Sequence, residues 1–453
     1  MATAQTTRKL LGAWYTPPEL VDHVVTRLLD GLVTPADRPV RVLDPACGDG
    51  RFLIEIAHRL RQRGVACELI GCDIDPAALD AIDDPSVCRV NADALAVDWA
   101  GATFDIVVGN PPFLSQMSTA TTRRGASRHG GGPYADAAAE FLSLAVRLAR
   151  ADGGRVALVL PQSIIGARDC GPVRAEVDTL ADLVWSWWEP RQQHFDAAVN
   201  VCALGFERPA KPAIRKRSWT SVVTDRLGIP VLDRSRLLTI GTIGDRAELN
   251  ANFRDEYYAL VPAVSDGADG PPLVTSGLID PGACLWGRRP VTFAKRTFQT
   301  PRVDLTKLTG RFPRWAKRKL VAKVLVANQT RVIEAVADPG GAWLPGVPVN
   351  TITPASAATP VDEIAAVLTS PVASLVAWHV AAGTGLSTST VRVAPAVLAS
   401  VPWPAGDLEA AVAALISGDV PECGRLVALA YGVPADEADV MLAWWRSRLP
   451  RPA

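Results

Sequence analysis

Two kinds of apolar pattern alternate over the first 210 residues. Short runs rich in Val, Ile and Leu predict strands, and longer stretches with apolar residues every three or four positions predict helices, most clearly over Arg51–Arg63 and Ala135–Arg150. Such alternation is typical of α/β proteins in which helices cover a mainly parallel sheet. The predicted strands are Val40–Asp44, Glu68–Asp73, Val87–Val90, Phe104–Gly109, Arg155–Pro161, Leu183–Trp188 and Val199–Phe206.

The pattern changes after Phe206. The segment 207–212 contains two prolines and several charges, which indicates a linker. Beyond it, short β-like runs are separated by Pro and Gly, with few clear helices before an Ala-rich segment near Leu408. We therefore predict a first domain over 1–210, a linker over 211–236 and a second, mixed α/β domain over 237–453.

Length and composition limit the class of protein. With 453 residues the chain can form two or three domains that each bury a core. No stretch approaches the ~18 consecutive apolar residues of a membrane span, and Met1–Leu11 lacks the apolar centre of a signal peptide. The eight cysteines form no C-x-x-C pair, so neither a disulfide framework nor a zinc site is expected. We predict a cytoplasmic protein that has no metal and does not bind membranes.

The net charge of zero conceals a strongly basic segment. Residues 288–323 hold 12 basic residues and one acidic residue, whereas residues 1–110 hold 10 and 16. This asymmetry favours a polyanion bound on one face, although a solvated basic surface is the alternative in a chain where 39 of the 47 basic residues are arginine. The residues expected to contact phosphates are Arg288, Arg289, Arg296, Arg302, Arg311, Arg314, Lys317, Arg318 and Lys319.

The first strand runs into a glycine-containing turn and then directly into a helix. Gly48 and Gly50 let the backbone approach a ligand, and the helix N-terminus offers free N–H groups. A dinucleotide site would need G-x-G-x-x-G, and Asp44 and Asp49 would repel its phosphates. Acidic residues instead suit a cationic ligand such as S-adenosylmethionine.

Carboxylates also follow the next two predicted strands. Asp73, after the second strand, can bind both hydroxyls of a ribose, and Asp93, after the third, can accept a bond from an adenine amine. Each aspartate alone would more simply be a turn or N-cap residue. Three of them at successive strand ends favour the cofactor site.

The fourth strand ends in Asn110-Pro-Pro-Phe113. At the carboxyl end of a central strand, this rigid segment projects into the crevice where α/β proteins bind ligands. The Asn110 side-chain oxygen and the Pro111 carbonyl can each accept one N–H of an exocyclic base amine, which frees its lone pair for a direct in-line transfer. Phe113 can stack on the base, which would have to be flipped out of a duplex.

On these motifs the sequence resembles the gamma-class, TaqI-like adenine-N6 DNA methyltransferases, whose target-recognition domain follows the catalytic domain. The resemblance implies a Rossmann-like, seven-stranded S-adenosylmethionine-dependent catalytic domain. Segment 12–19 resembles the family's N-terminal cofactor segment, although Thr16 and Glu19 also spell a helix capping box with Pro17 at the first helical position. The implied cofactor contacts are Tyr15, Thr16, Pro17, Asp44, Pro45, Ala46, Gly48, Gly50, Asp73, Ile74, Asp93 and Ala94.

The implied catalytic residues are Asn110, Pro111, Pro112 and Phe113, where tyrosine is commoner than phenylalanine in the family. Phe195 resembles the aromatic residue that stacks on the other face of the flipped adenine, and core packing explains it equally well. In the second domain, segments 273–277, 319–326 and 383–392 are similar to the family's target-recognition domains.

The resemblance implies methylation of the N6 amine of a flipped-out adenine at specific sites in double-stranded DNA. It is compatible with a restriction-modification or related defence system and with a separate restriction endonuclease or defence subunit as partner. Three alternatives stay open: a methyltransferase for an RNA base or a protein glutamine, methylation of the cytosine amine, and a non-catalytic DNA-recognition subunit. Methylation of cytosine carbon 5 would need a Pro-Cys pair, which the sequence lacks.

Overall fold

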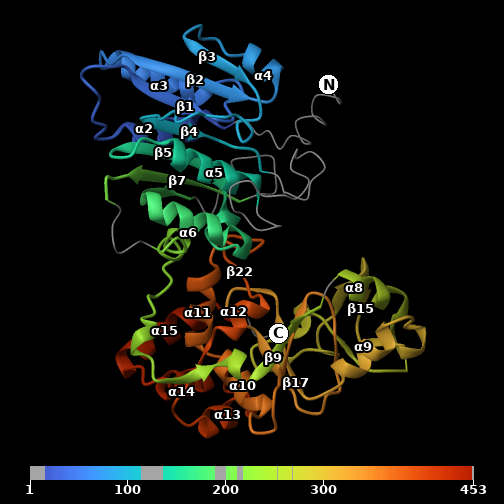
Figure 1. Ribbon diagram of the computed structural model, residues 1–453. Helices are drawn as coiled ribbons and strands as arrows, with labels where there is room; N and C mark the ends of the chain where they lie inside the picture. The colour runs from blue at the N-terminus through green and yellow to red at the C-terminus, as the bar shows by residue number, and fades with distance from the viewer. Residues whose placement is uncertain are drawn as a thin grey trace. The chain divides into compact units, whose positions relative to one another are not determined.

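The computed structural model describes residues 16–113, 136–188, 200–211, 218–252, 254–267 and 269–450 (Figure 1). The chain divides into two compact units, Met1–Val222 and Val223–Ala453. Within the linker predicted over 211–236, Trp219 is buried against Phe206, with 5.4 Å between the ring centroids. Its indole N–H donates to Asp178, so this residue packs on the first unit.

The first unit is built on one seven-stranded sheet with the strand order β3-β2-β1-β4-β5-β7-β6. Strands β1 to β5 pair in parallel, and β7 lies antiparallel between β5 and β6. This sheet confirms the predicted Rossmann-like α/β fold, and every predicted strand is present with its ends shifted by two residues at most. The strands are β1 (Val40–Asp44), β2 (Cys67–Asp73), β3 (Val87–Asn91), β4 (Ile106–Gly109), β5 (Gly154–Pro161), β6 (Asp182–Trp187) and β7 (Val201–Arg208).

Buried side chains cover both faces of this sheet. On one face, Val42, Ile106 and Ala157 share a core with α2 and α3. The alternate residues, among them Leu43 and Val107, point to the opposite face and are also fully buried. The helices are α2 (Pro18–Leu29), α3 (Arg51–Gln62), α4 (Pro76–Asp80), α5 (Ala137–Leu148), α6 (Gly171–Leu180) and, at the boundary of the two units, α7 (Ser221–Thr224).

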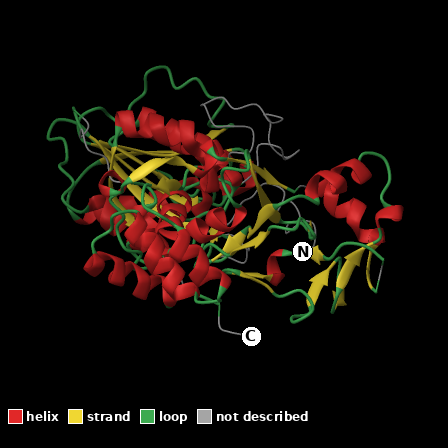
Figure 2. Ribbon diagram, turned by 90° about the horizontal axis from the view of Figure 1, so that it is seen from below, coloured by secondary structure: helices red, strands yellow, loops and turns green. Residues whose placement is uncertain are grey.

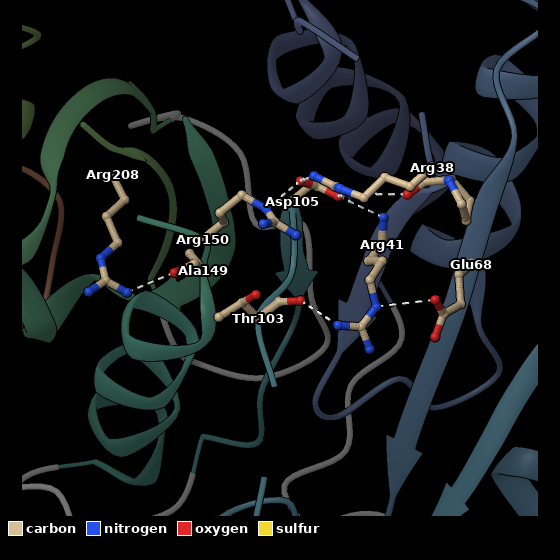
Figure 3. A network of polar contacts seen from close by, with 9 residues as sticks. Arg38, Arg41, Glu68, Thr103, Asp105, Ala149, Arg150 and Arg208 are labelled. Atoms are coloured by element: carbon tan, nitrogen blue, oxygen red, sulfur yellow. Dashed lines mark hydrogen bonds and ion pairs between the residues drawn. The ribbon is translucent and has the colours of Figure 1, made fainter. Parts of the chain in front are cut away.

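An ionic network fastens the amino ends of the central strands (Figure 3). Asp105, just before β4, accepts two bonds from the Arg38 guanidinium at 2.6 and 2.7 Å, one from the Arg41 backbone N–H and one from Arg150. Burial alone would raise the pKa of Asp105, but these bonds outweigh it and lower the pKa to about 2. Because the network lies at the amino ends, it holds the sheet together away from the ends where Asp44 and Asp73 lie.

The second unit mixes short strands with helices (Figure 2). Its largest sheet has four antiparallel strands in the order β19-β17-β21-β9. The strands are β8 (Thr239–Thr242), β9 (Ala247–Ala251), β10 (Val264–Asp266), β11 (Leu273–Val274), β12 (Ile279–Asp280), β13 (Ala283–Cys284), β14 (Val291–Phe293), β15 (Arg296–Phe298), β16 (Pro301–Val303), β17 (Lys323–Ala327), β18 (Gln329–Thr330), β19 (Ala335–Asp338), β20 (Leu344–Pro345), β21 (Val349–Pro354), β22 (Val391–Arg392) and β23 (Pro402–Pro404).

The helices of the second unit begin earlier in the chain than the sequence pattern indicated. Two that we did not predict, α10 and α11, lie before Leu408. Every residue of α11 from Pro371 to Trp378 is buried, so the helix shows no polar stripe in the sequence. The helices are α8 (Arg254–Leu260), α9 (Phe312–Lys319), α10 (Val361–Leu368), α11 (Pro371–Ala381), α12 (Pro395–Ala399), α13 (Glu409–Ile416), α14 (Val420–Ala430) and α15 (Ala435–Arg446).

Among the described residues, no single helix has the length and apolar composition of a membrane span. Helices α10 and α11 reach that length only together, and they are bent by 65° at the break between them. Most of their side chains are buried within the second unit.

Candidate active site

The order of the strands creates a crevice between the carboxyl ends of β1 and β4. From β1 the chain proceeds to β2 and β3 on one side, and then returns to place β4 on the other side of β1. In open α/β sheets, ligands bind outside the carboxyl ends of the strands at this switch point. The predicted cofactor and catalytic segments follow β1, β2, β3 and β4, and are therefore brought to one edge of the sheet.

The turn from β1 into α3 depends on its glycines. Gly48 has a φ of 53° and Gly50 a φ of 79°, in the left-handed region that favours glycine. A Cβ atom on Gly50 would also lie 3.2 Å from the side chain of Ile82. The backbone of the turn therefore carries no side chain at these two positions, just before the N-terminus of α3.

Asp44, the last residue of β1, is almost completely buried. Its Oδ1 accepts a bond of 3.0 Å from the Ala46 N–H. Burial raises the pKa of Asp44 well above its usual range, and the nearby carboxylates of Asp73 and Asp49 raise it further. A cationic ligand would lower the pKa of Asp44 again, since it would favour the charged carboxylate.

Asp73, the last residue of β2, joins two turns. Its Oδ2 accepts a bond of 2.8 Å from the Gly48 N–H, and its Oδ1 one of 2.9 Å from the Asp75 N–H. Burial raises the pKa of Asp73, although these two bonds oppose the rise. The carboxylate thus positions the glycine turn as well as the end of its own strand.

The end of β3 is tied to the same edge. The Asn91 side-chain amide donates to the backbone carbonyls of Asp73 and Ile74. The Asp93 Oδ1 accepts a bond of 3.1 Å from the Leu95 N–H, in the turn-forming role that is common for aspartate. Ala94 is buried, whereas the Ile74 side chain is half exposed and offers an apolar surface beside these carboxylates.

Gly109, the last residue of β4, allows close contact between the two central strands. A Cβ atom at this position would lie 2.5 Å from the Asp44 Oδ1. Among the residues that follow, Pro111 is buried, and Phe113 is half-buried against the core shared by α2 and α3. Gly109, the residue before Asn110, therefore lies against the buried carboxylate of Asp44.

Thr16 has a different role from the capping residue that the sequence suggested. Helix α2 begins at Pro18, one residue later than predicted, and no side chain caps its N-terminus. The Thr16 hydroxyl instead accepts a bond of 3.1 Å from the Asn110 Nδ2, and Thr16 is buried. The capping-box prediction was wrong because this tertiary contact occupies the hydroxyl.

Arg51 joins the N-terminal segment to the glycine turn, and the sequence analysis missed it. Its guanidinium donates to the Thr16 carbonyl at 3.1 Å and forms an ion pair of 2.9 Å with Asp49. The only sequence signal was a basic residue at the first position of α3 beside an acidic turn. Two predicted site residues, Tyr15 and Phe195, lie outside the described residues.

The comparisons with known proteins agree with this geometry. Residues 1–170 match the family described as N-6 DNA Methylase. This segment is similar to that family. The match confirms the predicted resemblance to the N6 DNA methyltransferases, and it identifies the cofactor as S-adenosylmethionine.

Two curated relatives match parts of the chain. The type II methyltransferase M.CvrRI of Paramecium bursaria Chlorella virus XZ-6E is 25% identical over 174 residues, which are 38% of this chain and 41% of the relative. The type II methyltransferase M.TthHB8I of Thermus thermophilus is 42% identical over 106 residues, which are 23% of this chain and 21% of the relative. The chain thus spans less than half the length of either relative.

A solved structure extends the likeness to the second unit. The type IIL restriction-modification enzyme MmeI, solved in complex with DNA, superposes with a TM-score of 0.55 over 98% of this chain and 76% of that chain. The two sequences are 14% identical, so the comparison shows a shared fold.

The site at the carboxyl ends of the strands fits a bound S-adenosylmethionine in three respects. The carboxylates of the buried Asp44 and the partly buried Asp73 suit a cation, the glycine turn allows close approach, and the exposed face of Ile74 suits a flat aromatic ring. Among the described residues, no three His, Cys, Asp or Glu side chains gather closely enough to hold a metal ion.

The nine basic residues predicted to contact DNA differ in their surroundings. Arg289 pairs with Asp280 at 3.0 Å, and Arg311 pairs with Asp255 at 2.7 Å. The others divide into residues bonded to neutral oxygens and exposed residues that form no ion pair or hydrogen bond with the described part of the chain. Arg288 donates to the Cys284 carbonyl, Arg302 to the Gly270 carbonyl and Lys319 to the Thr351 hydroxyl. The exposed residues are Arg296, Arg314, Lys317 and Arg318. One of these exposed residues, Arg296, lies over the ring of Phe298, 5.2 Å from its centroid.

Proposed function

We propose that this chain transfers a methyl group from S-adenosylmethionine to the N6 amine of adenine at specific sites in double-stranded DNA. The observation that carries the proposal is the position of Asn110, directly after β4, whose last residue Gly109 lies against the buried Asp44, within the segment that matches the N-6 DNA methylases. An acceptor amide and a site suited to a cation therefore meet at the switch point of the sheet.

The cofactor is held by the turns that follow β1, β2 and β3. Asp73 binds the ribose hydroxyls, Asp93 accepts from the adenine amine, and Ile74 packs against the adenine ring. When bound, S-adenosylmethionine supplies a methyl group activated by its sulfonium. Tyr15, Thr16 and Pro17 belong to the segment that encloses its methionine part.

The bond between Thr16 and Asn110 supports the catalytic role of the amide. Because the Asn110 Nδ2 donates to the Thr16 hydroxyl, the Asn110 Oδ1 is the end of the amide that is suited to accept an N–H. The Asn110 Oδ1 and the Pro111 carbonyl take the two N–H groups of the target amine. The nitrogen lone pair is then drawn out of conjugation with the ring and directed at the methyl group.

The target adenine must leave the duplex to reach this position. Its amine is paired inside B-form DNA, so the base is flipped into the site and its face stacks on Phe113. Phe195 is proposed to stack on the other face. The paired prolines 111 and 112 keep the backbone rigid between the acceptor amide and the aromatic ring.

The second unit is proposed to recognise the DNA sequence, with the domain limits predicted above. Two observations support this role: the concentration of basic residues over 288–323, and the fold shared with an enzyme solved on DNA. The names of the relatives favour a restriction-modification system. The partner proposed from the sequence is a separate restriction endonuclease or defence subunit. The protein would then act on DNA in the cytoplasm.

Modification-sensitive sequencing of genomic DNA tests the proposal. Cells that express the protein are compared with cells that express Asn110→Ala, and calorimetry checks that the variant binds S-adenosylmethionine within a few-fold of the original affinity. We expect N6-methyladenine confined to one short motif and present only with the unaltered protein.

Three results would contradict the proposal. Methylation that persists with Asn110→Ala would remove the catalytic assignment. Modified cytosine amines would correct the target base. DNA without any modification, from cells that contain folded protein able to bind the cofactor, would direct the search to RNA and protein acceptors.

A further inference from the structure

A small basic lobe of the second unit has its own hydrophobic core. It consists of α8, the β14–β15 hairpin, α9 and the adjoining strands, which lie together at one side of that unit (Figure 1). Phe293 and Phe298 of the hairpin share the core with Trp315 and Ala316 of α9. The hairpin and the helix are therefore fixed to each other by common packing.

The acidic partners of this lobe are unevenly distributed. Four of the 12 basic residues in 288–323 form ion pairs, namely Arg289, Lys307, Arg311 and Lys323. Five others are exposed and form no ion pair or hydrogen bond with the described residues: Lys295, Arg296, Arg314, Lys317 and Arg318. All five lie on the hairpin or on α9.

Helix α9 divides into a packed face and a cationic face. Trp315 and Ala316 are buried, whereas Arg314, Lys317 and Arg318 occupy positions three and four residues apart on the exposed side. Like charges four residues apart destabilise a helix, and α9 carries no acidic residue in its first turn to offset them. The helix thus keeps an arrangement that weakens it in isolation.

The turn of the hairpin has a strained backbone as well. The two residues between β14 and β15, Ala294 and Lys295, have φ values of 50° and 62°, which favour glycine or asparagine. Strain of this kind persists where the surrounding structure enforces it, and it is concentrated at functional sites. It projects Lys295 and Arg296 from the end of a rigid hairpin.

We propose that the β14–β15 hairpin and the exposed face of α9 form one surface that binds the phosphate backbone of double-stranded DNA. The inference rests on the proposed function and assigns it to five side chains, including Lys295, which the sequence analysis did not single out. Charge complementarity selects the partner, because five exposed cations outside the ion pairs of the described residues match a regularly spaced row of phosphates. The base-reading residues lie elsewhere, since backbone contacts carry no sequence information directly.

The salt dependence of DNA binding tests this surface. The full chain is titrated, by fluorescence anisotropy, into a labelled duplex of about 30 base pairs of mixed sequence at several salt concentrations. Each lost phosphate contact lowers the slope of log affinity against log salt by ~0.9. Lys295→Gln with Arg296→Gln should therefore lower it by about 2, and Arg314→Gln with Lys317→Gln and Arg318→Gln by about 3.

A matched control separates this surface from general charge. Arg226 and Arg446 are exposed arginines of the second unit outside the lobe, so changing both to Gln removes two charges, as the hairpin variant does. We expect the control to leave the slope unchanged. Each variant is first shown to bind S-adenosylmethionine and to melt as the unaltered chain does.

The outcomes distinguish this inference from the proposed function. Unaltered protein that binds the duplex, with the same slope in both lobe variants, would overturn the surface and leave the methyltransferase proposal standing. A change in only one of the two lobe variants would overturn the joint surface. Unaltered protein that does not bind the duplex would contradict both.

Discussion

The hydroxyl of Thr16 accepts a bond from the side chain of Asn110 across 94 residues of sequence, and we expect this bond to orient the amide that is proposed to act in catalysis. Thr16→Val keeps the shape of the side chain and removes the acceptor. We expect methyl transfer to slow about fivefold, in line with the loss of one hydrogen bond of about 1 kcal/mol, while affinity for S-adenosylmethionine stays within a few-fold. Single-turnover rates measure the effect, and Thr16→Ser should restore most of it. An unchanged rate with valine would show that the bond does not orient the amide.

The low pKa of Asp105 leads to a prediction about the stability of the protein in acid. Its pKa of about 2 lies below the ~3.9 of an unfolded aspartate, so it stabilises the fold fully above about pH 5 and loses this effect as the pH falls toward 2. Asp105→Asn should lower the free energy of unfolding by about 2 kcal/mol at neutral pH.

Denaturant unfolding of both proteins at several pH values checks this. The difference between them should shrink below about pH 4. A difference that stayed constant down to pH 2 would contradict the assignment of the low pKa to Asp105. Cofactor affinity should not change, because the network lies at the amino ends of the strands.

At the scale of single residues, local sequence rules found the groups at strand ends and missed the contacts between distant segments. Asp44, Asp73 and Asn110 could be predicted to meet because the carboxyl ends of neighbouring parallel strands share an edge. The roles of Thr16 and Arg51 could not, since each depends on a contact between segments far apart in the chain. For Thr16, the local capping rule also pointed to a competing role.

Among the secondary-structure elements, the β14–β15 hairpin combines strain with exposed charge. Replacing Ala294 by Asn and Lys295 by Gly fits the backbone of this turn and should stabilise the protein by about 1 to 2 kcal/mol. The same change removes one proposed phosphate contact and should lower the salt slope of DNA binding by about 1. Calorimetric melting and anisotropy measure the two effects. Lys295→Gln is the control, because it removes the charge and keeps the strained turn, so it should change only the slope.

The elements also show where hydrophobic patterns succeed. The strands of the first unit were predicted nearly to the residue because each is a short apolar run bounded by turn residues. Helices α10 and α11 were missed because packing on most sides leaves no polar stripe to mark the helical period. Burial on most sides thus removed the signal on which the prediction depended.

At the scale of the whole molecule, the residues proposed to hold the cofactor all belong to the first unit, which has its own core. S-adenosylmethionine at about 100 times its dissociation constant should stabilise that unit by about 2.7 kcal/mol. We expect scanning calorimetry to show its transition moving to higher temperature while that of the second unit stays in place. A single transition that moved as a whole would show that the two units unfold together. Asp73→Ala should reduce the shift.

The sheet order has a consequence for the chain while it is being synthesised. Within the described sheet, β6 is the edge strand, and its one neighbour is β7, which comes later in the sequence. As the protein emerges from the ribosome, β6 must therefore wait without a partner until the chain up to Arg208 has been made. During that interval β5 also lacks the strand that separates it from β6 in the finished sheet. A ribosome that paused between Trp187 and Val201 would thus expose the unpaired edge of β5 to chaperones or to neighbouring nascent chains.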